Sequence, residues 1–134
     1  MSAFHWSTRV YYEDTDAGGV VYYANYLGFL ERARTEWLRA QGHSQRALAA
    51  DPGVLLAVSE VNIRYRRPAR LDDLLVISCE PAPGGGASGV FAQQIHRDSA
   101  AGELLAEATV RVACVDAGDF RPRRLPPGIF GEWN

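Results

Sequence analysis

Hydrophobic and polar side chains alternate along the first segment of the chain, residues 4–13. One face of this segment carries Phe4, Trp6, Thr8, Val10 and Tyr12, and the other face is mostly polar or charged. A period of two is typical of a strand that buries one of its faces. We therefore expect a strand from Phe4 to Glu13.

A segment rich in glycine follows, and the hydrophobic period then changes to three or four residues. The repeating positions are Tyr26, Leu30, Ala33, Trp37 and Ala40. This stripe predicts one long amphipathic helix. Gly42 suits its C-terminal cap, because glycine adopts the left-handed conformation without a steric penalty. A second, short helix is expected from an N-cap at Ser44 to Ala50.

The period of two returns in the second half of the chain. It predicts four strands, at Val54–Arg66, Leu74–Glu80, Val90–Arg97 and Leu104–Asp116. Their short, turn-like connectors indicate hairpins and therefore an antiparallel sheet. The order of one strand, one long helix and four strands predicts an α+β fold, in which helix and sheet bury each other. We expect a single domain over residues 1–134, with a proline-rich tail from residue 121.

Composition narrows the class of protein. The chain has 134 residues, 47% of them hydrophobic, and a formal net charge of −2, which argues against nucleic acid as a partner. No apolar run approaches the ~20 residues that a membrane helix needs, and residues 1–6 do not resemble a signal peptide. We expect a cytoplasmic protein in which Cys79 and Cys114, both in apolar strand-like runs, are buried free thiols.

Three local patterns suggest ligand sites but lack essential parts. Residues 84–89 read GGGASG, which fits a dinucleotide-binding motif, but a strand pattern follows where a helix is needed. Residues 14–25 begin like a calcium loop but lack its fifth and twelfth ligands. The histidines His5, His43 and His96 are isolated in sequence. We therefore expect a hairpin loop at 84–89, no metal site, and no histidine-based catalytic triad.

All 14 basic residues are arginines. Two groups of them are close in sequence: Arg64, Arg66, Arg67 and Arg70, and then Arg121, Arg123 and Arg124. Arginines in such groups often mark a solvated face of a strand. Alternatively, the planar guanidinium groups could anchor the phosphates of a ligand.

The segment from Asp14 to Tyr26 joins the first strand to the long helix and carries the best candidate chemistry. Asp14 and Asp16 end the strand, and Gly18 and Gly19 then allow a tight turn. An aspartate before a glycine often accepts a hydrogen bond from the backbone two residues further on. The same carboxylates, close to the free N–H groups at the start of a helix, could instead form a reaction centre for a polarised carbonyl.

Four stretches together make a longer motif, which reads TDAGGVVYYANY at 15–26, FLERAR at 29–34, RPARLDD at 67–73 and VACVD at 112–116. This motif strongly resembles the hotdog-fold acyl-CoA thioesterases of the 4-hydroxybenzoyl-CoA thioesterase family, most closely its Tol-Pal-associated branch. The resemblance implies a hotdog fold, in which a curved, antiparallel, five-stranded sheet wraps around one long central helix. It also implies a homodimer or homotetramer and an association with the Tol-Pal envelope system.

The same resemblance implies an acyl-CoA substrate and a catalytic role for Asp16 as nucleophile or general base. The backbone N–H of Tyr23 is then the group that polarises the thioester carbonyl. Gly19 and Val20 are expected to contact the substrate. No cofactor is expected, because coenzyme A is itself part of the substrate.

Active sites in this family lie at a dimer interface, so Val58, Ser59 and Glu60 are expected to line the pocket, from a neighbouring chain or from the same one. The sequence departs from the family in two places. Many members of the Tol-Pal-associated branch have histidine where this chain has Tyr23. Residues 84–89 also lack the basic side chains that some relatives place against the CoA phosphates.

Two other functions remain open at this point. One is a non-catalytic protein that binds acyl-CoA or serves as an envelope-associated scaffold. The other is a hotdog enoyl-CoA hydratase or dehydratase, an enzyme class that usually pairs a carboxylate with a histidine. The 15–26 motif contains no histidine, which favours a thioesterase.

Overall fold

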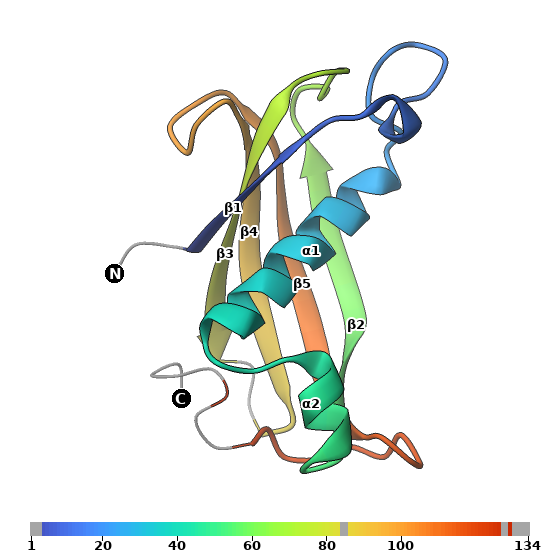
Figure 1. Ribbon diagram of the computed structural model, residues 1–134, viewed down its shortest axis with the longest axis vertical. Helices are drawn as coiled ribbons and strands as arrows, with labels where there is room; N and C mark the ends of the chain where they lie inside the picture. Colours follow the sequence, from blue (N-terminus) through green and yellow to red (C-terminus); the bar gives the residue numbers. More distant parts are fainter. Residues whose placement is uncertain (1–3, 84–85, 127–128, 130–134) are drawn as a thin grey trace.

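The fold is one five-stranded antiparallel sheet with a long helix lying across one of its faces (Figure 1). The computed structural model describes residues 4–83, 86–126 and 129. Its elements are β1 (Phe4–Arg9), a 3-10 turn η1 (Tyr12–Asp14), α1 (Asn25–Ala40), α2 (Gln45–Ala50), β2 (Val54–Tyr65), β3 (Leu74–Pro83), β4 (Ser88–Arg97) and β5 (Leu104–Asp116). The strand order β1-β3-β4-β5-β2 leaves β1 and β2 at the two edges. The predicted order of elements and the α+β class are confirmed.

The first strand is shorter than predicted. It ends at Arg9, although the Val10 N–H still donates to the Asp73 carbonyl at 2.9 Å in the same register, and the chain turns at η1. The carboxylate of Asp14 accepts the Tyr11 N–H at 2.8 Å and caps η1. Tyr12, predicted to lie on the buried face, is therefore 83% exposed, so that prediction is wrong.

The hairpin between β3 and β4 is tighter than predicted. β3 continues to Pro83 and β4 begins at Ser88, and the last pair of the ladder joins Pro83 to Gly89. The expected loop at 84–89 is thus partly strand, and its residues 84–85 lie outside the described part of the chain. Residues 127–128 and 130–134 of the proline-rich tail lie outside it as well.

The helix α1 buries four of the five residues of the predicted stripe and two further side chains. Its buried residues are Tyr26, Phe29, Leu30, Ala33, Trp37 and Leu38, whereas Ala40 in the last turn is exposed. Gly42 follows with a φ of +89°, so the predicted glycine cap is confirmed. Ser44 caps α2 by accepting the Ala47 N–H at 3.1 Å, also as predicted.

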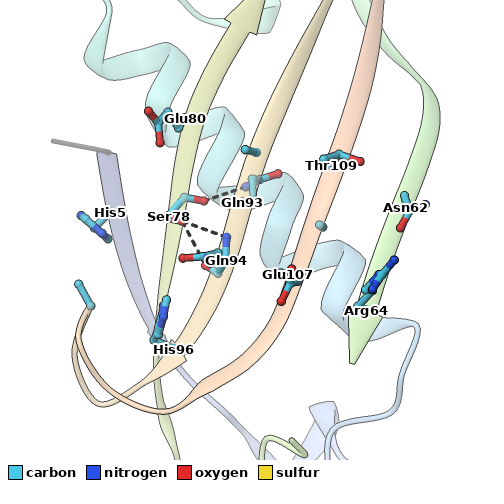
Figure 2. Close-up of a pocket in the computed structure, with 13 residues that line it drawn as sticks. His5, Asn62, Arg64, Ser78, Glu80, Gln93, Gln94, His96, Glu107 and Thr109 are labelled. Carbon is cyan, nitrogen blue, oxygen red and sulfur yellow. Dashed lines mark hydrogen bonds between the residues drawn. The ribbon is translucent and has the colours of Figure 1, made fainter. Parts of the chain in front are cut away.

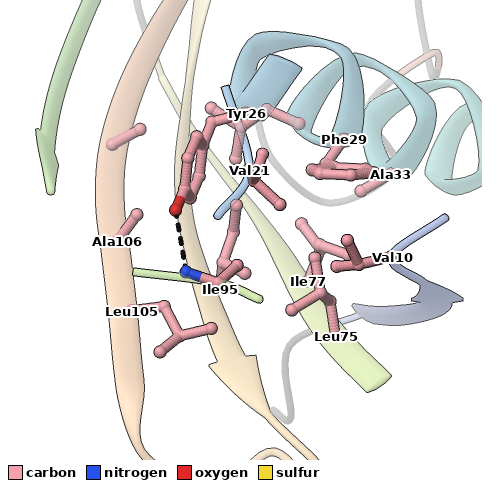
Figure 3. Packing of buried hydrophobic residues seen from close by; sticks show 13 residues of the cluster. Val10, Val21, Tyr26, Phe29, Ala33, Leu75, Ile77, Ile95, Leu105 and Ala106 are labelled. Carbon is pink, nitrogen blue, oxygen red and sulfur yellow. Dashed lines mark hydrogen bonds between the residues drawn. The ribbon is translucent and has the colours of Figure 1, made fainter. Parts of the chain in front are cut away.

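Two clusters of buried side chains fill the space between α1 and the sheet. The first surrounds the start of α1 and includes Val10, Val21, Tyr26, Phe29, Ala33, Leu75, Ile77, Ile95, Leu105 and Ala106 (Figure 3). The second lies at the other end of the helix and includes Trp37, Leu38, Leu48, Val54, Phe91, Val110 and Cys114. The helix is therefore packed along its length, and its first turn is held by the same core as the sheet.

A buried amide links the helix to the sheet between these clusters. Gln93 of β4 is 1% exposed and donates to the Leu30 carbonyl of α1 at 3.1 Å and the Ser78 carbonyl of β3 at 3.3 Å. Its oxygen accepts from Arg34 at 3.1 Å, and burial lowers the pKa of that guanidinium. These directed bonds fix how α1 sits along the sheet, because a buried polar group left unpaired costs free energy.

Both cysteines are free and buried, as predicted. Burial raises the pKa of Cys79 to about 12. It also raises the pKa of Cys114, although Arg123 acts in the opposite direction.

We predict that Cys79 in the folded protein resists iodoacetamide at pH 8. Only the thiolate reacts, and a pKa near 12 in place of 9 makes the thiolate about a thousandfold scarcer. Mass spectrometry of the protein alkylated in buffer and in urea measures the difference, and the unfolded chain is the control. Rapid alkylation of Cys79 in buffer would contradict the burial.

Candidate active site

The loop between η1 and α1 forms a small antiparallel ladder. Thr15 pairs with Val21, the Asp16 N–H donates to the Val20 carbonyl at 2.9 Å, and the Tyr22 N–H donates to the Asp14 carbonyl at 3.0 Å. The tip closes with a bond from the Gly19 N–H to the Asp16 carbonyl at 3.1 Å. Gly19 has a φ of +78°, so the turn needs a residue that tolerates the left-handed conformation.

A second ladder fastens this loop to the segment that follows β2. The Val21 N–H donates to the Ala69 carbonyl at 2.8 Å and the Leu71 N–H to the Gly19 carbonyl at 3.3 Å. The Ala69 N–H in turn donates to the phenol oxygen of Tyr26 on α1 at 3.0 Å, the dashed bond in Figure 3. Loop, helix and the 69–71 segment are therefore locked together.

Asp16 lies at the surface of this loop. Its Oδ1 accepts the Gly18 N–H at 2.8 Å, the turn interaction that the sequence predicts for an aspartate before a glycine. Within the described residues, Oδ2 makes no hydrogen bond. One oxygen therefore orients the carboxylate while the other stays open to a ligand or water.

Tyr23 contributes an open backbone donor beside the start of α1. The N–H of Tyr22 is used by Asp14, and the Asn25 N–H donates to the Tyr22 carbonyl at 2.8 Å. The N–H of Tyr23 has no acceptor among the residues that the structure describes. An open N–H next to a helix N-terminus suits an oxygen that gains negative charge. Asp16, Gly19, Val20 and Tyr23 thus belong to one loop.

Tyrosines surround this donor. The Tyr65 hydroxyl of β2 donates to the Tyr23 carbonyl at 3.1 Å, and the Tyr65 ring meets the Tyr26 ring edge-on at 5.0 Å. The Tyr22 and Tyr23 rings lie 4.9 Å apart. Hydrogen bonding and repulsion by Tyr23 raise the pKa of Tyr22, and burial, chiefly, raises the pKa of Tyr65. These two phenols are therefore neutral donors at pH 7, not bases.

The structure does not bring Val58, Ser59 and Glu60 to this loop within one chain. They lie in the middle of β2, where Ser59 forms a bulge and its hydroxyl donates to the Arg111 carbonyl at 3.4 Å. Tyr65, which reaches Tyr23, lies five to seven residues further along the strand, a distance of roughly 15–25 Å. Sequence reasoning missed Tyr65, because nothing local in the sequence indicates a contact across 42 residues.

A separate hollow of about 520 Å³ lies on the sheet face opposite α1 (Figure 2). Across it runs a row of polar side chains, one from each strand: His5, Ser78, Gln94, Glu107 and Arg64. None of the predicted catalytic or pocket residues on the 16–23 loop or at 58–60 lines it, but Arg64 of the first arginine group does. Within the described residues, neither of its histidines makes a hydrogen bond or ion pair with a carboxylate or hydroxyl, so the hollow offers no nucleophile paired with a base.

The structure also bears on the metal sites and membrane helices that the sequence was searched for. No group of three or more histidine, cysteine or acidic side chains in residues 4–83, 86–126 and 129 is arranged for a metal ion. No helix in the same residues is long and apolar enough to span a bilayer.

Several arginines of the two sequence groups form ion pairs. These pairs are Arg66 with Glu107 at 2.9 Å, Arg67 with Glu103 at 3.7 Å, Arg121 with Asp119 at 3.8 Å and Arg123 with Asp116 at 2.9 Å.

We predict that Gly19→Ala destabilises the fold by about 1–2 kcal/mol, because alanine is strained in the left-handed conformation. Space is not the cause, since a Cβ on Gly19 meets no atom within 4 Å. Gly28→Ala is the matched control: it too meets nothing within 4 Å, but it lies within α1, where alanine should stabilise by about 0.5–1 kcal/mol. Urea unfolding measures both, and equal effects would refute the left-handed turn.

Comparisons with known proteins show the family to which the chain belongs. Residues 18–111 match the model of the Thioesterase superfamily. The acyl-CoA thioester hydrolase YbgC of Escherichia coli O157:H7 is 51% identical over 130 residues, which cover 97% of this chain and 95% of that protein. The acyl-CoA thioesterase YbgC of Haemophilus influenzae is 45% identical over 128 residues, covering 96% and 92%.

Solved structures show the same fold. A probable thioesterase from Bartonella henselae superposes with a TM-score of 0.87 at 36% identity, covering 93% of this chain and 100% of that one. The predicted hotdog architecture and the resemblance to hotdog thioesterases are thereby confirmed. On the family match and on identities of up to 51% over almost the whole chain, this protein belongs to the thioesterase superfamily and is a hotdog-fold thioester hydrolase.

Proposed function

We propose that this enzyme hydrolyses acyl-CoA thioesters at the 16–23 loop, with Asp16 as the reactive carboxylate and the Tyr23 N–H as the donor to the thioester oxygen. The names of its YbgC relatives support the substrate class. The observation that carries the site is the pairing, on one loop, of an exposed carboxylate with an open oxygen and a backbone N–H without an acceptor in the described residues. In this proposal Gly19 and Val20, on the same loop, contact the substrate.

The chemistry follows from these two groups. As the carbonyl carbon is attacked, its oxygen gains negative charge, which the Tyr23 N–H stabilises. Asp16 either attacks the carbon itself, forming an anhydride that water then hydrolyses, or takes a proton from an attacking water. In the first route the C–S bond breaks as the anhydride forms, and hydrolysis of the anhydride then releases the free acid. In the second route the C–S bond breaks as the tetrahedral intermediate collapses to the free acid. A thiol with a pKa near 8.5 leaves as a thiolate, which takes its proton from water, so no histidine acid is required.

We further propose that a second copy of the chain completes the site. The edge strand β2 leaves Val58, Val61 and Tyr65 exposed by 48%, 38% and 46%. An exposed apolar strand edge favours pairing with another strand. Antiparallel pairing of two β2 edges about residues 61–62 sets Val58 of one copy opposite Tyr65 of the other, and Tyr65 contacts Tyr23. Val58, Ser59 and Glu60 then line the pocket from the second copy.

We predict that Asp16→Asn lowers the turnover number for acyl-CoA by at least about a hundredfold while folding remains normal, because a positioned base contributes about 10²- to 10⁴-fold. The measurement is thiol release over a panel of short, long and aromatic acyl chains, together with circular dichroism. Asp72→Asn is the control, since Asp72 is exposed, enters no ion pair within the described residues and has a φ of +70°, which asparagine tolerates.

Other outcomes of this assay distinguish the rival functions. Unchanged turnover in Asp16→Asn would refute the role of Asp16. Tight binding of every acyl-CoA by the wild type without thiol release would indicate a binding or scaffold protein. Addition of water to an enoyl-CoA without thiol release would indicate a hydratase.

We predict that Val61→Glu shifts the protein to a lower mass in light scattering and lowers thiol release with it, because a carboxylate at the paired edges is desolvated. Val61→Thr, which keeps the branched shape, should retain the assembly. The wild-type mass also decides between homodimer and homotetramer. A fully active monomer would contradict a shared site.

The remaining expectations concern the cell. We propose a single hotdog domain over residues 1–134 that works in the cytoplasm without a cofactor beyond its substrate. Association with the Tol-Pal envelope system stays a prediction from resemblance, which a pull-down with Tol-Pal components would test.

A further inference from the structure

Arg70 is an exposed arginine that the fold brings beside the candidate catalytic loop. It pairs with Val20 in the ladder made by the Val21–Ala69 and Leu71–Gly19 backbone bonds. The other unpaired arginine of its sequence group, Arg64, lies instead on the outer face of the sheet (Figure 2). The first arginine group therefore has one member at the site.

Asp16, Val20 and Arg70 form a short row across three adjacent backbone segments. The Asp16 N–H donates to the Val20 carbonyl at 2.9 Å, and Val20 pairs with Arg70. Neighbouring positions in antiparallel pairs are about 5 Å apart and direct their side chains to the same face. The backbone of Arg70 thus lies about 10 Å from the backbone of Asp16, and the extended arginine side chain is roughly 6 Å long.

The charge of Arg70 is not neutralised within the described residues. Its guanidinium has no ion pair or hydrogen bond there, whereas Arg67 pairs with Glu103 at 3.7 Å. Asp73, three residues further along the chain, accepts the backbone N–H of Arg70 at 2.8 Å and is already paired with Arg97. A solvated, unpaired guanidinium at the mouth of a site is suited to bind an anion bidentately.

We propose that Arg70 binds a phosphate of the coenzyme A half of the substrate and so makes the enzyme prefer CoA thioesters to thioesters without phosphate. This inference rests on the proposed acyl-CoA hydrolysis. The chain between the CoA sulfur and its nearest phosphate has about thirteen bonds and spans roughly 15 Å when extended. That length matches the distance from Asp16 to the end of the extended Arg70 side chain.

The second arginine group is less suited to this role. Arg123 is held by Asp116 at 2.9 Å and by the Pro52 and Gly53 carbonyls, so its donors are occupied in the fold. Arg121 pairs with Asp119 at 3.8 Å. With residues 84–89 lacking basic side chains, Arg70 is the candidate that combines free charge with proximity to the loop.

The test compares one acyl group on two carriers, CoA and pantetheine, the latter without phosphate. The acyl group is the one that the wild type hydrolyses fastest. Arg70→Gln should raise KM for the CoA thioester about tenfold, as expected for one charge-assisted contact, with kcat and the KM for the pantetheine thioester within about twofold. Arg70→Lys should restore part of the affinity, and Arg64→Gln should change neither KM.

Calorimetric titration with free CoA and with pantetheine provides a readout that needs no turnover. Arg70→Gln should weaken binding of CoA about tenfold and leave pantetheine unchanged. Equal effects on both carriers, or none on either, would overturn the role of Arg70. If the wild type releases no thiol from either thioester, the proposed function fails, and the CoA titration still decides whether Arg70 holds a phosphate.

Discussion

The hydrogen-bonded junction between residues 19–21 and 69–71 is the contact on which the candidate site depends. Ala69 takes part in it twice, through its carbonyl to Val21 and through its N–H to the Tyr26 phenol. Val21, Tyr26 and Ala69 are all buried, so these bonds are shielded from water. One junction therefore fixes the turn that carries Asp16, the first turn of α1 and the segment after β2.

Periodicity was sufficient to predict the long helix and the presence of the five strands, because the pattern in each runs over six or more residues. The short helix α2 was predicted instead from its N-cap at Ser44. The turn at Asp16 could also be predicted, since an aspartate before glycines often accepts a hydrogen bond from the backbone two residues further on. The end of β1 could not be predicted in this way. Tyr12 continues the alternation of the sequence, but the chain has already turned there, because Asp14 caps the 3-10 turn. Local patterns predict elements, and capping bonds decide where they stop.

The contacts that define the site lie beyond what local patterns can show. Tyr65 reaches Tyr23 across 42 residues, and Arg70 pairs with Val20 across 50. The motif at residues 67–73 indicates through resemblance alone that this segment belongs to the site. It does not show which of its arginines lacks an ion-pair partner. Ion pairs separate the arginines: Arg67 has an acid partner within the described residues and Arg70 does not.

The two buried cysteines have a consequence for a thioester hydrolase. Each turnover of such an enzyme liberates a thiol, and under oxidising conditions thiols form mixed disulfides with exposed protein thiolates. Cys79 is 1% exposed and Cys114 is 0% exposed, and burial raises the pKa of both. Burial in the core therefore keeps both cysteines of the enzyme from exchanging with the thiol that it releases.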